Sequence, residues 1–373
     1  MTAVEHLRDA RVLRVTFENG AQADYPFLWL RDNCPSGFHP QTQERMQDLL
    51  ALPAGIGVDS AAIEDGALAV AWEASVHRSR FPLDWLARHR PGTPLDDPAD
   101  IAPRLWRAKT GLAGMPRGDA AALLADDVAL SHWMRETRAH GLALVEGLPA
   151  DQKAGMKVAR RISFLRETNF GTVFEVKSKP NPNNLAYTAV ALPLHTDLPN
   201  QELPPGYQFL HCLANEALGG GSVFADGFAI ADSLRAQEPA LFDLLSTRSI
   251  PFRFHDGEYD IRRRQKVITL DEAGAVTEIC WNAHLAETFD MPAGEMAAYY
   301  EAYRAFMATL RHPKWAVEFA LKPGQMVVFD NRRVLHGRAA FNPTTGRRHL
   351  RGFYVDRGEF DSRLRVLARP PGA

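Results

Sequence analysis

A histidine and an aspartate separated by a single residue are the first pair in this sequence that could do chemistry together. They are His195 and Asp197, within Leu194-His195-Thr196-Asp197-Leu198-Pro199. In an extended strand, side chains two positions apart point to the same face, so the imidazole and the carboxylate could bind one divalent metal ion. Such a spacing also arises often by chance, and two polar residues on a loop are the alternative interpretation.

A third ligand and a cation follow much later in the chain. His336 comes after the apolar run 326–329, which reads as a strand. Two histidines and one carboxylate are typical of the metal site of non-haem Fe(II) oxygenases, which leaves positions on the metal open. Arg348 starts the next expected strand, and its planar guanidinium suits the far carboxylate of a metal-chelating dicarboxylate such as 2-oxoglutarate. Each residue alone is also consistent with an exposed polar side chain, and it is their order that predicts an iron site.

The composition of the chain argues against several other classes of protein. Its 373 residues are 46% hydrophobic and 24% charged, with a formal net charge of −2, so we expect no nucleic-acid partner and no membrane-surface partner. Three scattered cysteines (Cys34, Cys212 and Cys280) are too few for a disulfide framework and fit a reducing compartment. The first residues lack the apolar region of a signal peptide, and no apolar run has membrane-spanning length. We therefore expect a soluble, cytoplasmic protein.

Strand and helix signals divide the chain into two domains. Residues 1–92 predict a small N-terminal β-rich domain, with a hairpin signal at Asn19-Gly20. Residues 93–118, rich in Pro, Gly and Asp, predict a linker. Residues 119–373 predict a mainly β domain with flanking helices, expected over 119–140, 151–167, 228–246 and 292–310. Because strands and helices do not alternate regularly, the pattern favours an antiparallel double-sheet barrel over a doubly wound parallel sheet.

Further motifs accompany the candidate iron site. They are Asn183-Asn184-Leu185-Ala186-Tyr187-Thr188, Pro204-Pro205-Gly206, Leu210-His211-Cys212, Gly219-Gly220-Gly221-Ser222 with Asp226-Gly227-Phe228, Asp330-Asn331, Leu335-His336-Gly337-Arg338, Arg348-His349-Leu350 with Gly352-Phe353-Tyr354, and Trp29-Leu30-Arg31-Asp32-Asn33-Cys34 near the start. Through these motifs nearly the whole chain resembles the gamma-butyrobetaine hydroxylase branch of the TauD-like Fe(II)/2-oxoglutarate-dependent dioxygenases. The resemblance implies a double-stranded β-helix (jelly-roll) catalytic domain and a homodimer.

The resemblance also implies cofactors and roles. His195, Asp197 and His336 would bind Fe(II), Arg348 would bind the distal carboxylate of the co-substrate 2-oxoglutarate, and Ser222 would lie near that co-substrate. With O2, such an enzyme hydroxylates an aliphatic carbon and releases succinate and CO2. The alternative from a different class is a catalytically inactive relative that acts as a scaffold, and the intact ligand set weighs against it.

The substrate of this branch carries a trimethylammonium group held by aromatic faces, since a quaternary cation offers no hydrogen bond. The matching positions are Phe170, Phe174, Tyr187, Leu198 and Tyr354, while Asn184 and Asn282 match amides that would hold or orient the anionic end. At the positions of Phe170, Phe174 and Leu198, the gamma-butyrobetaine hydroxylases typically have Tyr, Trp and Tyr. Leu198 cannot host a cation, so the departures put the exact substrate in doubt.

The expected substrate is a small trimethylammonium zwitterion, either gamma-butyrobetaine or an analogue such as 2-(trimethylamino)ethylphosphonate. The phosphonate is considered because Arg351 and the run Arg262-Arg263-Arg264 offer additional cations. A hydroxylase of trimethyllysine, a sulfonate or an amino acid is the alternative.

The N-terminal domain raises a separate metal question. Related proteins bind structural zinc there through three cysteines and a histidine. At the matching positions this chain has Cys34, Ser36, His39 and His77. Cys34, His39 and His77 could still bind zinc, but a closed structural site needs four ligands, so a metal-free domain is the interpretation we favour.

Overall fold

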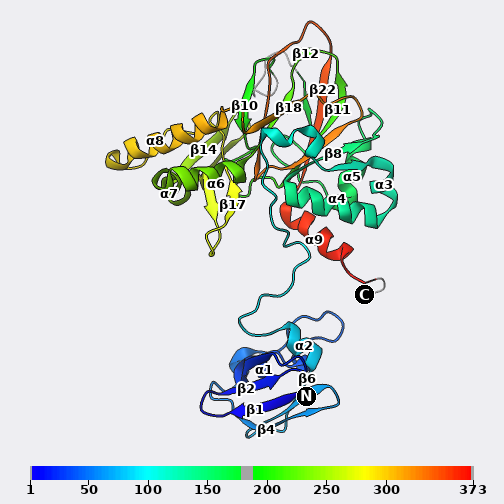
Figure 1. The fold of residues 1–373 in the computed structure, drawn as a ribbon, viewed down its shortest axis with the longest axis vertical. Coiled ribbons are helices and arrows are strands. Elements are labelled where there is room, and N and C mark those ends of the chain that lie inside the picture. The colour runs from blue at the N-terminus through cyan, green and yellow to red at the C-terminus, as the bar shows by residue number, and fades with distance from the viewer. Residues whose placement is uncertain (1, 178–187, 371–373) are drawn as a thin grey trace. The chain divides into compact units, whose positions relative to one another are not determined.

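The computed structural model describes residues 2–177 and 188–370. The chain forms two compact units, Met1–Asp97 and Pro98–Ala373, each described by itself below (Figure 1). Residues 98–118, assigned above to a linker, therefore belong to the second unit. Among the described residues, no helix combines the length and the apolar character needed to cross a membrane.

The first unit contains two three-stranded antiparallel sheets. One consists of β1 (Ala3–Leu7), β2 (Val12–Thr16) and β3 (Gln22–Pro26), the other of β4 (Val58–Glu64), β5 (Ala67–Trp72) and β6 (Arg78–Pro82), accompanied by α1 (Phe27–Asp32), α2 (Leu83–Arg88) and the 3-10 turns η1 (Pro35–Gly37) and η2 (Leu49–Ala51). The hairpin expected at Asn19-Gly20 joins β2 to β3, and Gly20 has the positive φ of +80° that glycine tolerates. Leu13, Val15 and Leu68 contribute to one core shared by both sheets.

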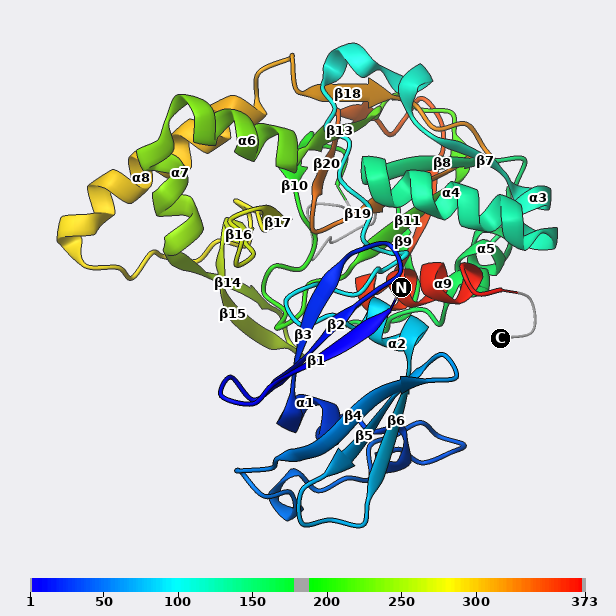
Figure 2. The same cartoon turned by 60° about the horizontal axis from the view of Figure 1, so that its bottom comes forward.

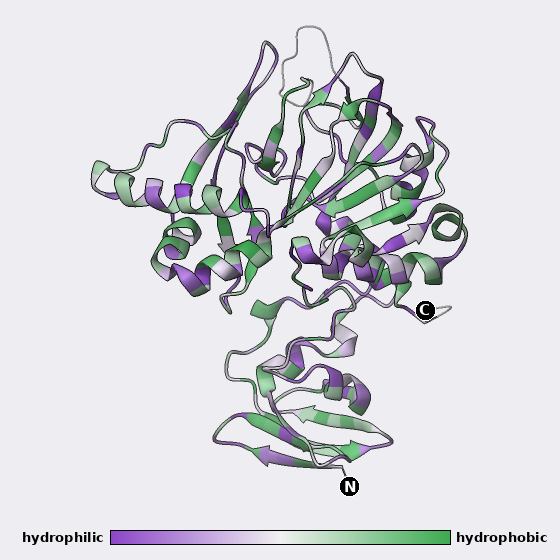
Figure 3. Cartoon of the chain, turned by 45° about the horizontal axis from the view of Figure 1, so that its top comes forward, coloured by the Kyte–Doolittle hydropathy of each residue, from purple (hydrophilic) through white to green (hydrophobic). Residues whose placement is uncertain are grey.

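The second unit is built on a sandwich of two sheets. The larger sheet has the order β7-β8-β19-β11-β22-β9 and the smaller sheet the order β10-β20-β13-β18. Their strands are β7 (Arg117–Asp119), β8 (Leu142–Glu146), β9 (Phe174–Val176), β10 (Leu192–His195), β11 (Tyr207–Asn215), β13 (Ser222–Asp226), β18 (Ala316–Phe319), β19 (Met326–Asp330), β20 (Val334–Arg338) and β22 (Arg348–Val355). Leu210, Phe224 and Phe329 are buried between the sheets, and the strands are largely hydrophobic in Figure 3. The predicted jelly-roll class, mainly β with flanking helices, is confirmed.

Two groups of helices cover the sandwich on opposite sides (Figure 2). One group consists of α3 (Ala120–Ala125), α4 (Asp127–His140), α5 (Ala154–Ile162) and α9 (Arg357–Leu367), and it shares a core with the outward-facing Phe209 and Phe353 of the larger sheet. The other group consists of α6 (Gly227–Gln237), α7 (Pro239–Thr247) and α8 (Ala293–Leu310). These pack in a second core with the strand pairs β14 (Ser249–His255) with β15 (Asp260–Lys266) and β16 (Ile268–Leu270) with β17 (Val276–Ile279). The remaining elements are β12 (Leu218–Gly219), β21 (Phe341–Asn342), η3 (Ala108–Thr110) and η4 (Leu112–Gly114).

Two of the four expected helices are each divided in the structure. The helix expected over 119–140 is interrupted at Asp126, whose carboxylate accepts a hydrogen bond from the Val128 amide and so starts α4. The helix expected over 228–246 is interrupted before Pro239, which begins α7 because proline fits the first turn of a helix and not its interior. The expected helix over 151–167 is shorter, and α8 matches the helix expected over 292–310 to within a residue at its start.

Candidate metal centre and active site

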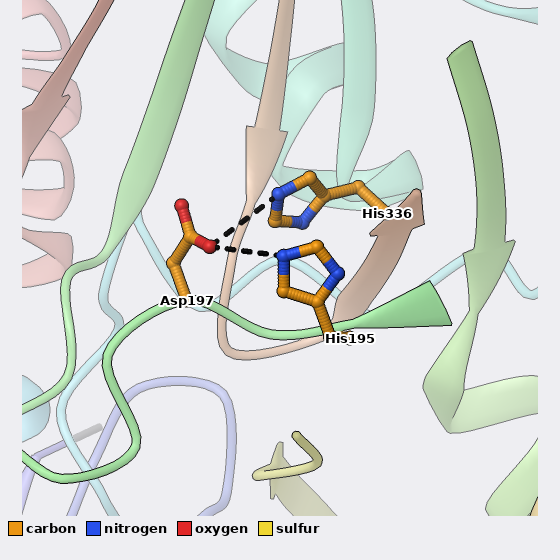
Figure 4. Close-up of side chains that lie close together, drawn as sticks. All are labelled: His195, Asp197 and His336. Atoms are coloured by element: carbon orange, nitrogen blue, oxygen red, sulfur yellow. Dashed lines mark ion pairs between the residues drawn. The ribbon is translucent and has the colours of Figure 1, made fainter. Parts of the chain in front are cut away.

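Two neighbouring strands of the smaller sheet bring the two histidines together. His195 ends β10, His336 lies on β20, and the two residues are direct cross-strand partners. Asp197 follows in the turn after β10, and its Oδ1 atom lies 3.2 Å from His195 Nε2 and 3.6 Å from His336 Nε2 (Figure 4). The possible ligand atoms of all three residues lie within 4.8 Å of one another. In the described part of the chain, no other group of three or more His, Cys, Asp or Glu residues is so arranged.

Buried hydrogen bonds hold the backbone of Asp197 in place. Asn331, which is fully buried, accepts a hydrogen bond from the Asp197 amide through Oδ1 at 2.6 Å and donates through Nδ2 to the Asp197 carbonyl at 3.1 Å. The preceding Thr196 exchanges hydrogen bonds with the backbone of Trp281. The turn that carries the carboxylate is thus fixed on both sides.

The side chains of two ligands are also oriented by hydrogen bonds. His195 Nδ1 lies 2.9 Å from the Pro193 carbonyl, which can only accept, so Nδ1 carries a proton and Nε2 is the ring nitrogen that faces Asp197. The Tyr354 hydroxyl donates to Asp197 Oδ2 at 2.7 Å and leaves Oδ1 facing the histidines. Outer hydrogen bonds of this kind are what orient the ligands of metal sites.

Electrostatics favour the protonation states that a divalent metal needs. Burial, together with the charge of His195, lowers the pKa of His336 to about 3, although Asp197 acts in the opposite direction. Burial alone would raise the pKa of Asp197, but His336, His195 and the Tyr354 hydroxyl together hold it well below its usual value. A metal would therefore meet a neutral imidazole at His336 and an ionised carboxylate at Asp197. The donor set fits Fe(II).

Arg348 lies in the same cavity as the three ligands. That cavity is lined by His195, Asp197, His336, Ser222 and Arg348, among others. Arg348 is only 8% exposed; burial lowers its pKa to about 10, and the charge that acts against it most is that of Arg338. No acid within the described ranges offsets this charge. A buried guanidinium that lacks a carboxylate partner, in a cavity with a metal triad, fits the distal carboxylate of 2-oxoglutarate.

Gly220 explains how Arg348 is held. Arg348 Nε donates to the Gly220 carbonyl at 3.1 Å. Gly220 has a φ of +71°, and a Cβ atom there would lie 2.9 Å from Arg348 Nε. The glycine run before Ser222 therefore has a physical role, because a side chain at Gly220 would displace the arginine.

Of the residues expected around a trimethylammonium group, only some lie near the metal ligands in the described part of the chain. Phe174 lines the cavity, and its ring packs against that of Tyr354 with centroids 5.2 Å apart. Leu198 is buried directly after Asp197, with a positive φ of 54°. Phe170 packs instead against Phe254 of β14, at 5.2 Å. Tyr187 and Asn184 lie outside the described residues.

Asn282 has contacts of its own. Its Nδ2 donates to the Thr196 carbonyl at 3.2 Å, and its Oδ1 accepts from the backbone amides of His284 and Leu285. These bonds use most of the capacity of the amide and orient the segment that carries Asp197. Its expected contact with the substrate stays a prediction.

The additional arginines lie outside the lining of the cavity. Arg262 forms an ion pair with Asp260 at 2.9 Å and Arg264 with Asp290 at 2.5 Å, all exposed near the β14–β15 hairpin. Arg351 lies 3.4 Å from Glu175 of β9. Arg262, Arg264 and Arg351 therefore each contact an acid, and none of the four additional arginines lines the cavity.

Three residues of this site were not predicted from the sequence to have a functional role. Asn331 holds Asp197, while Arg338 and Gln208 line the cavity. The period of two in a strand was the available signal for Arg338, because it follows His336 by two positions on β20 and shares its face. Gln208 could have been found in the same way, from its alternation with the inward-facing Leu210 and Cys212.

Replacing Tyr354 with phenylalanine tests the hydroxyl on Asp197 while keeping the ring. We expect Tyr354→Phe to weaken Fe(II) binding at least about tenfold, the lower end of what loss of an outer hydrogen bond to a ligand costs. Anaerobic titration with Fe(II) measures this. Tyr207→Phe is the matched control, because the buried Tyr207 hydroxyl has no hydrogen-bond partner in the described part of the chain. Equal affinities for the two variants would contradict the role of the hydroxyl.

The N-terminal residues expected to bind zinc are not gathered as a set of three. Cys34 Sγ lies 3.4 Å from His77 Nε2 and 3.2 Å from the Ser36 hydroxyl. His39 instead accepts backbone hydrogen bonds from Gln41 and Thr42 through Nδ1. Ser36 also replaces a strong ligand by a hydroxyl. The donor set therefore does not fit a four-ligand structural zinc site.

Replacing Ser36 and His39 with cysteine should create a four-ligand zinc site together with Cys34 and His77. We expect the chain with Ser36→Cys and His39→Cys to carry one additional zinc ion, because thiolates are preferred ligands at structural sites. Elemental analysis of the dialysed protein measures this, in a His195→Ala background so that zinc at the triad is not counted. Stoichiometric zinc in that background without the cysteines, lost on His77→Ala, would mean that the natural residues bind the metal.

Comparisons with known proteins agree with this geometry. A sequence model described as "Taurine catabolism dioxygenase TauD, TfdA family" matches residues 106–354, and one described as "Gamma-butyrobetaine hydroxylase-like, N-terminal" matches residues 4–87. A gamma-butyrobetaine dioxygenase from Pseudomonas sp. (strain AK-1) is 43% identical, over 95% of this chain and 93% of its own. The human gamma-butyrobetaine dioxygenase is 31% identical (97% and 96%), as is the mitochondrial trimethyllysine dioxygenase of Rattus norvegicus (92% and 82%). The chain belongs to the TauD, TfdA family and is a 2-oxoglutarate-dependent dioxygenase that uses Fe(II).

Proposed function

We propose that the enzyme hydroxylates an aliphatic carbon of a small trimethylammonium carboxylate, with gamma-butyrobetaine as the first candidate. The observation that carries the proposal is the cavity shared by the triad and the buried Arg348, together with the aromatic pair Phe174 and Tyr354. Relatives that align over nearly the whole chain act on gamma-butyrobetaine or trimethyllysine. Both of these molecules carry a trimethylammonium group.

In the proposed mechanism, His195, Asp197 and His336 bind Fe(II), and Arg348 with Ser222 binds the distal carboxylate of 2-oxoglutarate. Together with O2, iron and 2-oxoglutarate supply the oxidising power that hydroxylates a C–H bond, with release of succinate and CO2. The residues of the chain contribute by holding the metal ligands in position. Tyr354 orients the Asp197 carboxylate, and Asn331 fixes its backbone. The apolar lining, which includes Phe224 and Leu350, excludes water from the reacting groups.

The trimethylammonium end is proposed to lie against Phe174 and Tyr354. A quaternary cation is attracted to the faces of aromatic rings, and among the described residues Phe174 and Tyr354 are matching rings that pack together, with the Tyr354 hydroxyl on Asp197. Leu198 offers only apolar contact. We therefore infer a cation site that holds its substrate more weakly than a full aromatic cage would.

A carboxylate is favoured over a phosphonate at the other end of the substrate. The phosphonate hypothesis rested on Arg351 and on residues 262–264. Because Arg351, Arg262 and Arg264 form ion pairs with acids and do not line the cavity, they offer no free charge for a dianion.

The test is succinate formation with three matched compounds. They are gamma-butyrobetaine, 5,5-dimethylhexanoate, in which an uncharged tert-butyl group replaces the trimethylammonium group, and 2-(trimethylamino)ethylphosphonate. We expect kcat/KM for 5,5-dimethylhexanoate to fall roughly 5- to 30-fold, since cation–π contacts contribute about 1–2 kcal/mol. We also expect the phosphonate to be the poorer substrate of the two trimethylammonium compounds. Equal kcat/KM for gamma-butyrobetaine and 5,5-dimethylhexanoate would overturn the proposed site for the trimethylammonium group. A preference for trimethyllysine, a sulfonate or an amino acid would replace the proposed substrate.

We further propose a cytoplasmic homodimer with separate N-terminal and catalytic domains and with no nucleic-acid or membrane partner. The near-neutral charge of −2 supports the last point, and the likeness of residues 4–87 to a gamma-butyrobetaine hydroxylase-like N-terminal unit supports the domain division. Light scattering on the purified chain measures the oligomeric state, and a monomeric mass would contradict the dimer.

A further inference from the structure

Gln208 places an amide inside the active-site cavity. It lies on β11 directly opposite Tyr354 of β22 and Phe329 of β19. Its side chain lines the same cavity as the three candidate metal ligands and Arg348. Because Tyr354 reaches Asp197 through its hydroxyl, Gln208 lies at the metal end of this cavity.

The amide of Gln208 has an unused polar end. Gln208 is only 2% exposed, and its Oε1 atom has no hydrogen-bond partner among the residues that the structure describes. In contrast, the amides of Asn331 and Asn282 are hydrogen-bonded to the backbone around Asp197. A buried polar group without a partner destabilises a fold, so buried groups of this kind call for an explanation such as a ligand.

The chemistry of the cavity limits what that ligand group can be. A carboxamide offers an acceptor at one end and donors at the other, and a half-turn of the amide exchanges the two. Its acceptor end suits a water molecule bound to the metal, and its donor end suits a carboxylate oxygen bound there. A trimethylammonium group offers neither an N–H donor nor an acceptor, so it cannot satisfy this amide.

We propose that Gln208 is a further binding residue of the metal centre, whose carboxamide hydrogen-bonds an oxygen ligand of the metal. The ligand is water before the co-substrate arrives, or the carboxylate of the 2-oxo acid afterwards. This inference rests on the proposed metal site at His195, Asp197 and His336. It adds a contact to the ligand on the metal and not to the metal itself.

The experiment compares Gln208→Met with Leu210→Met in the full-length chain. Leu210 lies two positions along the same strand face and lines the same cavity, and its replacement removes no polar group. We expect metal-free Gln208→Met to unfold at the same temperature as the natural chain or up to about 2 °C higher, because an unsatisfied amide is removed. We also expect its anaerobic affinity for Fe(II) or for 2-oxoglutarate to fall about five- to tenfold.

The two titrations separate the two sources of oxygen. A loss of affinity seen with Fe(II) alone identifies bound water as the partner, and a loss seen only when 2-oxoglutarate is added identifies its carboxylate. Lower thermal stability of Gln208→Met with unchanged affinities would overturn the inference, since Gln208 would then be structural. Failure of the natural chain to bind Fe(II) is a different result, because it would remove the proposed metal site and this inference together.

Discussion

Replacement of His195 by alanine is expected to abolish 2-oxoglutarate turnover while the protein stays folded. His195 provides one of three clustered ligand atoms, and the remaining two belong to residues on different segments. Loss of a direct ligand should cost more than the roughly 10- to 100-fold that outer contacts of a metal site cost. Succinate formation under saturating Fe(II) measures the effect, and circular dichroism checks the fold.

His284→Ala is the matched control for this prediction. Its ring lies 6.3 Å from that of His195, yet His284 is not part of the triad. We expect this variant to retain turnover. Residual activity of His195→Ala near that of His284→Ala would show that the catalytic metal lies elsewhere.

Replacement of Arg348 by methionine is expected to raise the KM for 2-oxoglutarate by roughly 30-fold to several thousand-fold. This range corresponds to the 2–5 kcal/mol that removal of one partner from a buried, hydrogen-bonded charge pair costs. The large value follows from burial, because little water can replace the guanidinium in a cavity where Arg348 is 8% exposed. Steady-state kinetics with varied 2-oxoglutarate give the KM.

Arg351→Met provides the comparison on the same strand. Arg351 lies three positions further along β22 and is paired with Glu175, so its loss should leave the KM for 2-oxoglutarate unchanged. The metal-free Arg348→Met protein should be no less stable than the natural chain, since the change removes a buried cation that has no acidic partner in the described part of the chain. An unchanged KM in Arg348→Met would mean that another group, such as Arg338, binds the co-substrate.

Much of the fold was predictable because strand periodicity and turn residues are local signals. The β-rich first unit, the Asn19-Gly20 hairpin and the antiparallel double-sheet character of the second unit followed from such signals, whereas the jelly-roll class came from the resemblance to a family. Helix ends were harder to predict. Asp126 starts a new helix inside an apparently continuous helical pattern, and only the tertiary packing of α3 and α4 decides whether such a cap is used.

The ligands of the site were predictable from the order of residues along the chain, and their supporting contacts were not. Two histidines in this order, one of them two residues before Asp197, indicate a metal site directly in the sequence. Asn331 and Gln208 are ordinary amides whose importance comes from where β19 and β11 place them. The additional arginines suggested a phosphonate substrate for the same reason. The charge of Arg264 can be read from the sequence, but its ion pair with Asp290 depends on the fold.

The amide of Asn331 links residues that are remote in the chain. It lies just after β19, on the connection that leads into β20 and His336, and it joins both backbone groups of Asp197. Two ligands that are remote in the sequence are therefore held together by the polypeptide itself. The centre is preorganised, so metal binding requires little ordering of the chain, and exchange of one divalent ion for another should proceed without refolding. Discrimination among metals then depends on ligand chemistry and on the supply of each ion, and not on a cost of assembling the site.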